Sequence, residues 1–505
     1  MRQIGKLTTG IVMAALAVTL LGGCKKFLDR KPLSASIDDL QGGELEGRVL
    51  GLYGAIRNSK VEPFVGDGLQ GIAYLAMQGF RSDDAEITAD PGASAWHQTY
   101  DNFQYTKDDW GAGMYWSKHY VFIGLANEAL AAVAETTPTA TTKIYESEAK
   151  FFRAYTYFDM VRTFGDVPKI DFVITKPTDA HVPKVTADAI YDFIESDLSY
   201  AVQNLPLSWD ASYSGRLTAG AAKTLLAKVK LYRKKWSDAL SLTKEVIASN
   251  QYELVKPYYQ IFKTTGELSK ESIFEIQASK SAGDGDTYWS RFGQAQGIRG
   301  SGTWDLGWGW NTPTQSLVDS YAPGDQRKDA TILESGKPDG GTSTGGYGLT
   351  LPALAHTYWN KKVYNRYEDY LAAGLGTPNN EAQNTWINQR VLRYADVLLM
   401  AAEAANEVGG ASNTSDAIKW VNMIRDRAGL AAITGTPTQA ELRTIIKKER
   451  RAEFAMEFER FFDLVRWGDA TTVLGPLGYQ NKHRYYPIPT AALSDNPKLT
   501  QNPEW

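Results

Sequence analysis

Two stretches of this chain carry the pattern of a short helical hairpin, and this pattern constrains the fold more than any other feature. In the first stretch, residues 221–232 and 236–249 each place apolar residues on one helical face. Residues 393–424 repeat the pattern, with alanines where paired helices approach closely in tetratricopeptide repeats. Residues 110–164 and 416–468 supply two further pairs. The sequence therefore predicts a mainly α, tetratricopeptide-like scaffold of helix pairs.

A Gly- and Trp-rich region interrupts this scaffold between the two hairpins. Residues 281–350 contain 15 glycines, about twice the density of the whole chain. Glycine is costly in a helix interior, so long helices are not expected here. We predict a loop-rich insertion over about 281–385 that lies on the scaffold. Loops held by a rigid scaffold are where recognition residues usually lie.

The amino terminus has the pattern of a secretion signal. Two basic residues precede an apolar run over 11–21 that is too short to cross a bilayer. The run ends in Leu-Gly-Gly-Cys, which resembles a bacterial lipobox, and Cys24 is the one cysteine of the chain. We predict a signal peptide at 1–23, a lipid on Cys24, and a single domain over 24–505.

Charge and composition argue against several classes of function. The net charge is −4, and removing Arg2 and Lys6 with residues 1–23 leaves 52 basic against 58 acidic residues. No basic stripe appears, so a nucleic-acid partner is not expected. One cysteine permits neither an intramolecular disulfide nor a cysteine cluster for zinc. The 14 tryptophans and 27 tyrosines, in contrast, are many.

Residues 447–468 have the apolar period of a half-buried helix, with Gly468 at its end. Three carboxylates recur at every fourth position: Glu449, Glu453 and Glu457. Such a column repels itself unless cations balance it, and Arg460 falls on the same face. We predict a carboxylate–guanidinium network. The rival interpretation makes Glu453 and Glu457 an acid/base pair for hydrolysis, but neighbouring arginines would keep both carboxylates ionised.

Several motifs of the chain resemble those of the SusD/RagB family. They are Glu449-Arg450-Arg451-x-Glu453-Phe454, Asp463-Leu464-x-Arg466-Trp467-Gly468, the helix motif from Glu148 to Pro168, Lys25-Lys26-Phe27-Leu28-Asp29-x-x-Pro32, Tyr485-Tyr486-Pro487-Ile488-Pro489, and the segment from Asn496 to Pro503. Together they span nearly the whole chain, although the insertion matches no motif. One departure concerns Phe458, because a common form of the signature has Gly there.

This resemblance implies an outer-membrane lipoprotein that captures glycans for a SusC-like, TonB-dependent transporter. In the RagB branch of the family the ligand is a peptide. The implied partners are thus an oligo- or polysaccharide, the transporter and, through the lipid anchor, the outer membrane. The resemblance implies no enzymatic activity and no cofactor.

Aromatic side chains in the two irregular regions are the candidate ligand contacts. Sugar rings stack their apolar CH faces on flat aromatic rings, and their hydroxyls need carboxylate, amide or guanidinium partners. The candidate glycan-binding residues are Asp83, Trp96, Tyr100, Asn102, Tyr288, Trp289, Arg291, Trp304, Trp308 and Trp310, with Asp305 as a further polar partner. The alternative is that some of these tryptophans only pack loops onto the scaffold. Loops from the two regions converge on one face in SusD-like proteins.

Catalytic and metal-binding patterns are missing from the sequence. The five histidines are scattered, with no paired spacing, and there is no phosphate-binding loop or nucleophile motif. Asp83-Asp84 and Asp284/Asp286 offer calcium ligands, but no calcium-binding loop surrounds them. We therefore expect a binding protein without cofactor or metal. The alternatives are a RagB-like peptide binder, an extracellular carboxylate-pair glycoside hydrolase, and a purely structural assembly module.

Overall fold

The computed structural model describes residues 45–57, 68–87, 95–278, 290–366, 368–369 and 385–505. The predicted signal peptide and Cys24 lie outside these residues, as do Tyr288 and Trp289. Within the described ranges, no helix combines the length and the apolar character that crossing a membrane requires.

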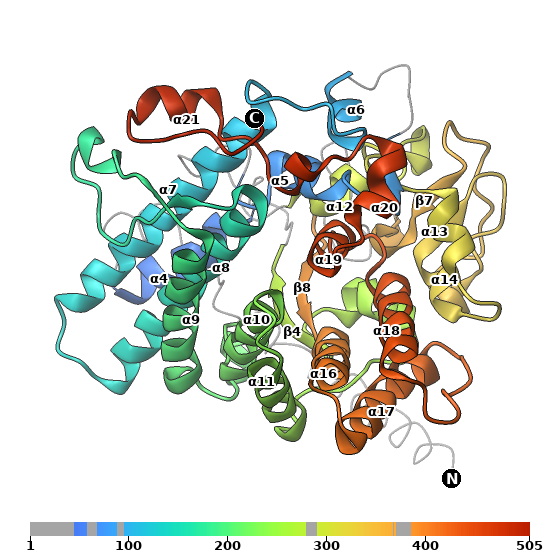
Figure 1. Cartoon of the computed structure of the whole chain (residues 1–505). Coiled ribbons are helices and arrows are strands. Elements are labelled where there is room, and N and C mark those ends of the chain that lie inside the picture. The colour runs from blue at the N-terminus through green and yellow to red at the C-terminus, as the bar shows by residue number, and fades with distance from the viewer. Residues whose placement is uncertain (1–44, 58–67, 88–94, 279–289, 367, 370–384) are drawn as a thin grey trace, which may run out of the picture.

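A row of antiparallel helices forms the scaffold (Figure 1). In chain order its members are α7 (Trp110–Ala134), α8 (Ala140–Phe164), α9 (Ala187–Asn204), α10 (Ala219–Tyr232), α11 (Trp236–Ala248), α16 (Tyr394–Val408), α17 (Ala411–Arg427) and α18 (Gln439–Phe454). Each of the first five packs on the next, and α16 then packs on α11 although the whole insertion separates them in sequence. The predicted mainly α scaffold of tetratricopeptide-like helix pairs is confirmed.

Local signals explain where these helices begin and how closely they pack. The Thr218 hydroxyl accepts a hydrogen bond from the Ala221 amide and caps α10. Thr139 caps α8 in the same way, so α8 begins at Ala140, five residues before the predicted start. Ala222 and Ala239 are fully buried, which lets α10 and α11 approach closely.

Within the described ranges, the strands pair into four two-stranded antiparallel ribbons. They are β1 (Ala85–Glu86) with β5 (Thr312–Pro313), β2 (Val167–Pro168) with β3 (Lys184–Val185), β4 (Ser272–Ile276) with β8 (Gln389–Arg393), and β6 (Ile332–Glu334) with β7 (Tyr358–Asn360). The β4–β8 ribbon flanks the insertion and leads it out of the scaffold between α11 and α16. The β1–β5 ribbon pairs Ala85 with Pro313 and Glu86 with Thr312. It therefore fastens the first irregular region to the insertion.

The shorter helices lie at the ends of the scaffold and in the insertion. They are α4 (Leu45–Ala55), α5 (Ile72–Gly79), α6 (Ala95–Asp101), α12 (Arg291–Gln296), α13 (Gln315–Ser320), α14 (Gln326–Thr331), α19 (Arg460–Trp467), α20 (Ala470–Leu474) and α21 (Thr490–Asp495). In Figure 1, α13, α14 and β7 form one side of the molecule. The helix α6 corrects the sequence analysis, which treated residues 89–104 as irregular. Its Trp96 and Tyr100 lie one turn apart, and both pack on neighbouring aromatic rings.

The prediction of one helix over 447–468 is wrong. Helix α18 ends at Phe454, and Arg460 begins a separate helix, α19. Met456 and Phe458 adopt left-handed backbone conformations, with φ of 67° and 66°, which an α-helix cannot continue through. Gly468 does end α19, in the left-handed conformation expected of a helix terminus.

Candidate functional site

The carboxylate column of α18 is balanced inside the protein by cations from other elements. Glu449 is paired with Arg327 at 2.8 Å, and the Arg393 guanidinium reaches both Glu453, at 3.0 Å, and Glu457, at 2.8 Å. Burial alone would raise the pKa of Glu453, but the charges of Arg427 and Arg393 outweigh it and lower that pKa to about 2. Glu453 therefore stays ionised and cannot serve as the protonated acid that hydrolysis requires. The role of this network is structural.

Arg460 does not belong to this network, which corrects the sequence analysis. The helix break turns it toward Asp83, whose two carboxylate oxygens lie 2.8 and 2.9 Å from its Nε and Nη2. Arg451 pairs with the neighbouring Asp84 at 2.7 Å. Although burial opposes it, the hydrogen bond and charge of Arg460 lower the pKa of Asp83. Asp83 therefore joins the loop before β1 to α19 by an ion pair.

Two tryptophans of helices and two of the insertion loop meet in one place, and we call them the aromatic cluster: Trp96 of α6, Trp110 of α7, Trp308 and Trp310. The ring centroid of Trp96 lies 4.9 Å from Trp110 and 5.4 Å from Trp310, edge to face in both pairs. Trp308 lies 5.1 Å from Trp310. Trp110 keeps 37% of its surface exposed, and the other three are half-buried. The cluster thus offers aromatic surface to solvent.

Arg291 and His97 border the cluster, and Asp101 ends the helix that carries Trp96. The Arg291 guanidinium lies 5.0 Å from the Trp308 ring centroid, in a cation–π arrangement. His97 stacks on Trp96 with ring centroids 3.6 Å apart. Asp101, at the end of α6, is half-buried. Burial, together with the negative charge of Glu86, raises the pKa of Asp101 to about 7.

Backbone contacts hold the insertion loop that carries Trp308 and Trp310. The Trp308 and Trp310 amides donate hydrogen bonds to the carbonyls of Gln294 and Ala295, each at 2.8 Å. The loop therefore lies directly against α12. A Cβ at Gly307 would come within 2.4 Å of the Gln294 carbonyl oxygen, so this approach requires glycine.

The structure places other predicted site residues away from this surface. Trp304 lies on a different part of the insertion, parallel to the Tyr364 ring at 6.4 Å and under the Arg366 guanidinium at 4.6 Å. Tyr100 is only 1% exposed and packs under α7, where a Cβ at Gly111 would lie 2.2 Å from its hydroxyl oxygen.

Asn102 and Asp305, two polar residues named as candidate partners, are both half-buried. The Asn102 amide donates to the Gln98 carbonyl at 2.9 Å as the chain leaves α6. Asp305 ends the short turn that carries Trp304. Neither Asn102 nor Asp305 is part of the aromatic cluster.

Sequence reasoning missed Trp110 and His97 as members of the site. Trp110 was expected only as the first residue of a helix, which it is. His97 was counted among scattered histidines. Both reach the site through the tertiary position of α6 beside α7, which no local spacing indicates.

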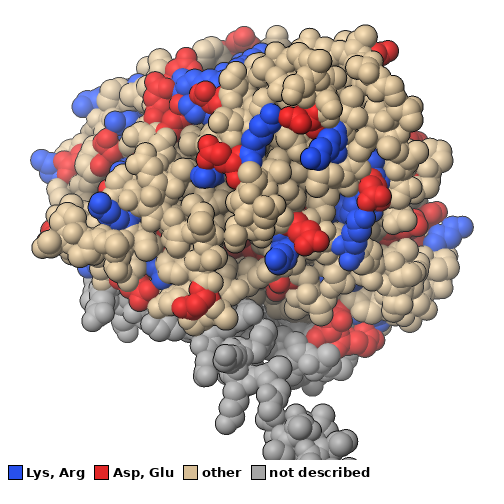
Figure 2. Space-filling view, turned by 90° about the horizontal axis from the view of Figure 1, so that it is seen from below, with Lys and Arg blue, Asp and Glu red and all other residues tan. Residues whose placement is uncertain are grey.

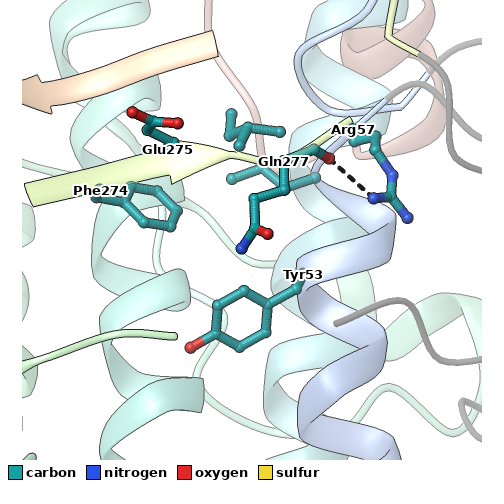
Figure 3. Close-up of a pocket in the computed structure, with 7 residues that line it drawn as sticks. Tyr53, Arg57, Phe274, Glu275 and Gln277 are labelled. Carbon is teal, nitrogen blue, oxygen red and sulfur yellow. Dashed lines mark hydrogen bonds between the residues drawn. The ribbon is translucent and has the colours of Figure 1, made fainter. Parts of the chain in front are cut away.

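A small cavity lies elsewhere, at the junction of α4 and β4 (Figure 3). Its polar groups already have partners: Arg57 Nη1 donates to the Gln277 carbonyl at 2.8 Å, and Glu275 accepts from the Leu268 amide and from Asn388. This cavity has room for about one water molecule. It does not provide a ligand site.

Surface charge and metal-ligand geometry add little to the site. On the face seen in Figure 2, basic and acidic side chains intermingle over the described residues, without a basic patch. Across the described part of the chain, no group of three His, Cys, Asp or Glu side chains is arranged to hold a metal ion.

The fold and the site together define a class: helical-repeat proteins that present tryptophans on loops above the scaffold. Two family models match this chain, one described as "SusD family" over residues 270–484 and one as "Starch-binding associating with outer membrane" over residues 65–231. SusD-like protein P2 of Formosa agariphila is 31% identical over 451 residues, covering 84% of this chain and 86% of that protein. The chain belongs to the SusD-like family.

Solved structures agree with this assignment. A laminarin-binding SusD-like protein superposes with a TM-score of 0.76 at 26% identity, covering 92% of this chain and 99% of its own. Surface glycan-binding protein A of Bacteroides fluxus gives a TM-score of 0.75, also at 26% identity, covering 94% of this chain and 100% of its own.

Proposed function

We propose that this chain is a cell-surface lipoprotein that captures an oligo- or polysaccharide on the aromatic cluster and delivers it to a SusC-like, TonB-dependent transporter in the outer membrane. One observation carries the binding role. The β1–β5 ribbon brings Trp96 and Trp110 beside Trp308 and Trp310, so segments far apart in sequence build a single aromatic surface.

The chemistry of this surface suits a sugar chain. Indole faces stack on the CH faces of pyranose rings, and rings at different inclinations follow the curvature of an oligosaccharide. Trp96 and Trp310 are inclined by 83°, and Trp308 and Trp310 by 53°. Arg291, which lies against Trp308, supplies a donor for sugar hydroxyls.

Binding is tested with the mature chain against a glycan panel in isothermal titration calorimetry. Laminarin and starch come first, because one similar structure is a laminarin-binding protein and one matching family model is described as starch-binding. Saturable binding to a glycan supports the proposal. Binding to peptides alone would favour the RagB-like alternative, and release of reducing ends from a bound glycan would favour a hydrolase.

The anchor and the partner are tested in cells. Cys24→Ala should move the protein out of the membrane fraction, because acylation at Cys24 is the proposed anchor. Sedimentation of that variant with outer membranes from cells without the transporter would contradict the anchor. Purification of the native protein in mild detergent should recover a large β-barrel transporter, and recovery of the protein alone at several salt concentrations would contradict the partnership.

A further inference from the structure

A second small cavity lies behind the aromatic cluster. It is enclosed by the end of α5, the segment entering β1, the residue after Trp310, and the break between α18 and α19. Asp84 and Asn311 line it, and each is 2% exposed. Asp84 Oδ2 and Asn311 Oδ1 are buried without a hydrogen-bond partner among the described residues. Buried oxygens without a donor are unfavourable in a folded protein.

The Asn311 side-chain amide cannot be flipped, with Oδ1 and Nδ2 exchanged, to give Oδ1 a hydrogen-bond donor. Its Nδ2 donates to Gln296 Oε1 at 2.9 Å, and Gln296 Nε2 in turn donates to the Phe292 carbonyl at 3.1 Å. A backbone carbonyl only accepts, so it fixes the orientation of Gln296 and then that of Asn311. Asn311 Oδ1 must therefore be the atom left without a donor.

Asp84 is fixed in the same way by its arginine neighbours. Its Oδ1 accepts from Arg451 Nε at 2.7 Å. Arg460 Nε lies 4.0 Å from its Oδ2, which is too far for a hydrogen bond. The cavity therefore holds two acceptor oxygens and needs a donor for each.

We propose that one buried water molecule binds in this cavity and donates one hydrogen to Asp84 Oδ2 and the other to Asn311 Oδ1. The cavity has room for about one water molecule. Ser82 also lines it, and its hydroxyl can donate to the water oxygen as a third partner. Buried waters typically make about three such bonds.

A metal cation is a poorer occupant of the same space. Calcium takes about six to eight oxygen ligands, and only one carboxylate oxygen here is unshared. Arg451 and Arg460 also lie against Asp84, so their positive charges repel a cation. Water satisfies both oxygens without adding charge.

The water joins the site to the scaffold. Asn311 follows Trp310 directly and holds a left-handed backbone, with φ of 57°. A bridge from Asn311 to Asp84 fixes this backbone beside α5 and the helix break, and so fixes where the Trp310 indole points. This consequence rests on the proposed glycan-binding function, whereas the water site itself does not.

A crystal structure of the mature chain, at a resolution that shows ordered waters, tests the site without any glycan. We expect one density peak about 2.6–3.2 Å from both Asp84 Oδ2 and Asn311 Oδ1. An empty cavity, a direct contact between the two side chains, or a peak ringed by six or more oxygens would each overturn the proposal.

A solution measurement tests the same water independently. Asn311→Gly keeps the left-handed backbone accessible and removes the amide oxygen. Water-oxygen relaxation dispersion should then report one long-lived water fewer than in the wild-type chain. An unchanged count in the folded variant would overturn the proposal. Glycan titrations of the same samples separate this result from the proposed function.

Discussion

The presence or absence of arginine partners shifts the pKa values of Glu453 and Asp101 in opposite directions. Glu453 is surrounded by guanidinium groups, and its pKa falls to about 2, so it stays ionised. Asp101 is buried beside Glu86 rather than beside a cation, and its pKa rises to about 7. Ion pairing therefore keeps the Glu453 carboxylate charged, whereas the pKa of Asp101, at the end of α6, lies near neutral pH.

Removing Arg460 should destabilise the fold. The guanidinium binds both oxygens of Asp83 with little solvent access, so Arg460→Ala leaves a mostly buried carboxylate with Arg451 as its remaining cation. We expect a loss of about 2–4 kcal/mol in urea unfolding. The control is Lys244→Ala, whose pair with Asp416 is largely exposed and should contribute less than about 1 kcal/mol. Equal effects of the two variants would show that the Asp83 pair is solvated.

His483 should make stability depend on pH between about 4 and 6.5. Burial, aided by the charges of Lys482 and Arg81, lowers its pKa to about 4 in the folded chain. The unfolded chain then binds more protons in this window, so the free energy of unfolding falls as pH falls from 6.5 to 4. The variant His483→Gln cannot protonate, and the difference between the two stability–pH curves isolates this group. Parallel curves over that window would contradict the pKa shift.

The helix break after Phe454 shows how a non-local contact overrides a helical pattern. No glycine or proline lies between 455 and 459, so the periodicity favoured one continuous helix. Phe458 instead adopts φ of 66° and inserts its ring between Tyr74, at 6.2 Å, and Phe292, at 5.9 Å. Phe292 belongs to α12, which supports the insertion loop of the site.

Two variants of Phe458 separate its backbone strain from its packing. Losing the packed ring should cost about 3–5 kcal/mol in Phe458→Ala. Phe458→Gly loses the same ring but relieves the left-handed strain, which is worth about 1–2 kcal/mol. We therefore expect the Gly variant to be the more stable of the two in urea unfolding, with both below wild type. An Ala variant at least as stable as the Gly variant would contradict the strain.

Much of the helical scaffold could be predicted because its signals are local. Residue patterns located α10 and α11 to within a few residues. The site was harder to predict. Trp96, Trp308 and Trp310 stood out by composition, but the separation of Trp304 and the contribution of Trp110 depend on how α12, α6 and α7 pack. Sequence spacing carries no information about those contacts.

At the scale of the whole molecule, two ribbons position the site. The β4–β8 ribbon leads the insertion out of the helical row (Figure 1). The β1–β5 ribbon fastens the insertion to the segment before α6. The aromatic cluster therefore exists only when both ends of the scaffold are folded. This arrangement places recognition on loops and stability on helices, so side chains of the cluster can change with limited effect on the fold.

The central claim is that the aromatic cluster binds glycan, and titration of one double variant tests it most directly. Trp96→Ala combined with Trp308→Ala removes two stacking faces, worth about 0.5–1.5 kcal/mol each. Together that loss of about 1–3 kcal/mol should weaken binding of the glycan identified by the panel by about 5- to 150-fold, with little change in melting temperature. Phe172→Ala, which removes an aromatic ring 41% exposed outside the cluster, should bind as wild type. Wild-type affinity in the folded double variant, or its unfolding, would contradict the account.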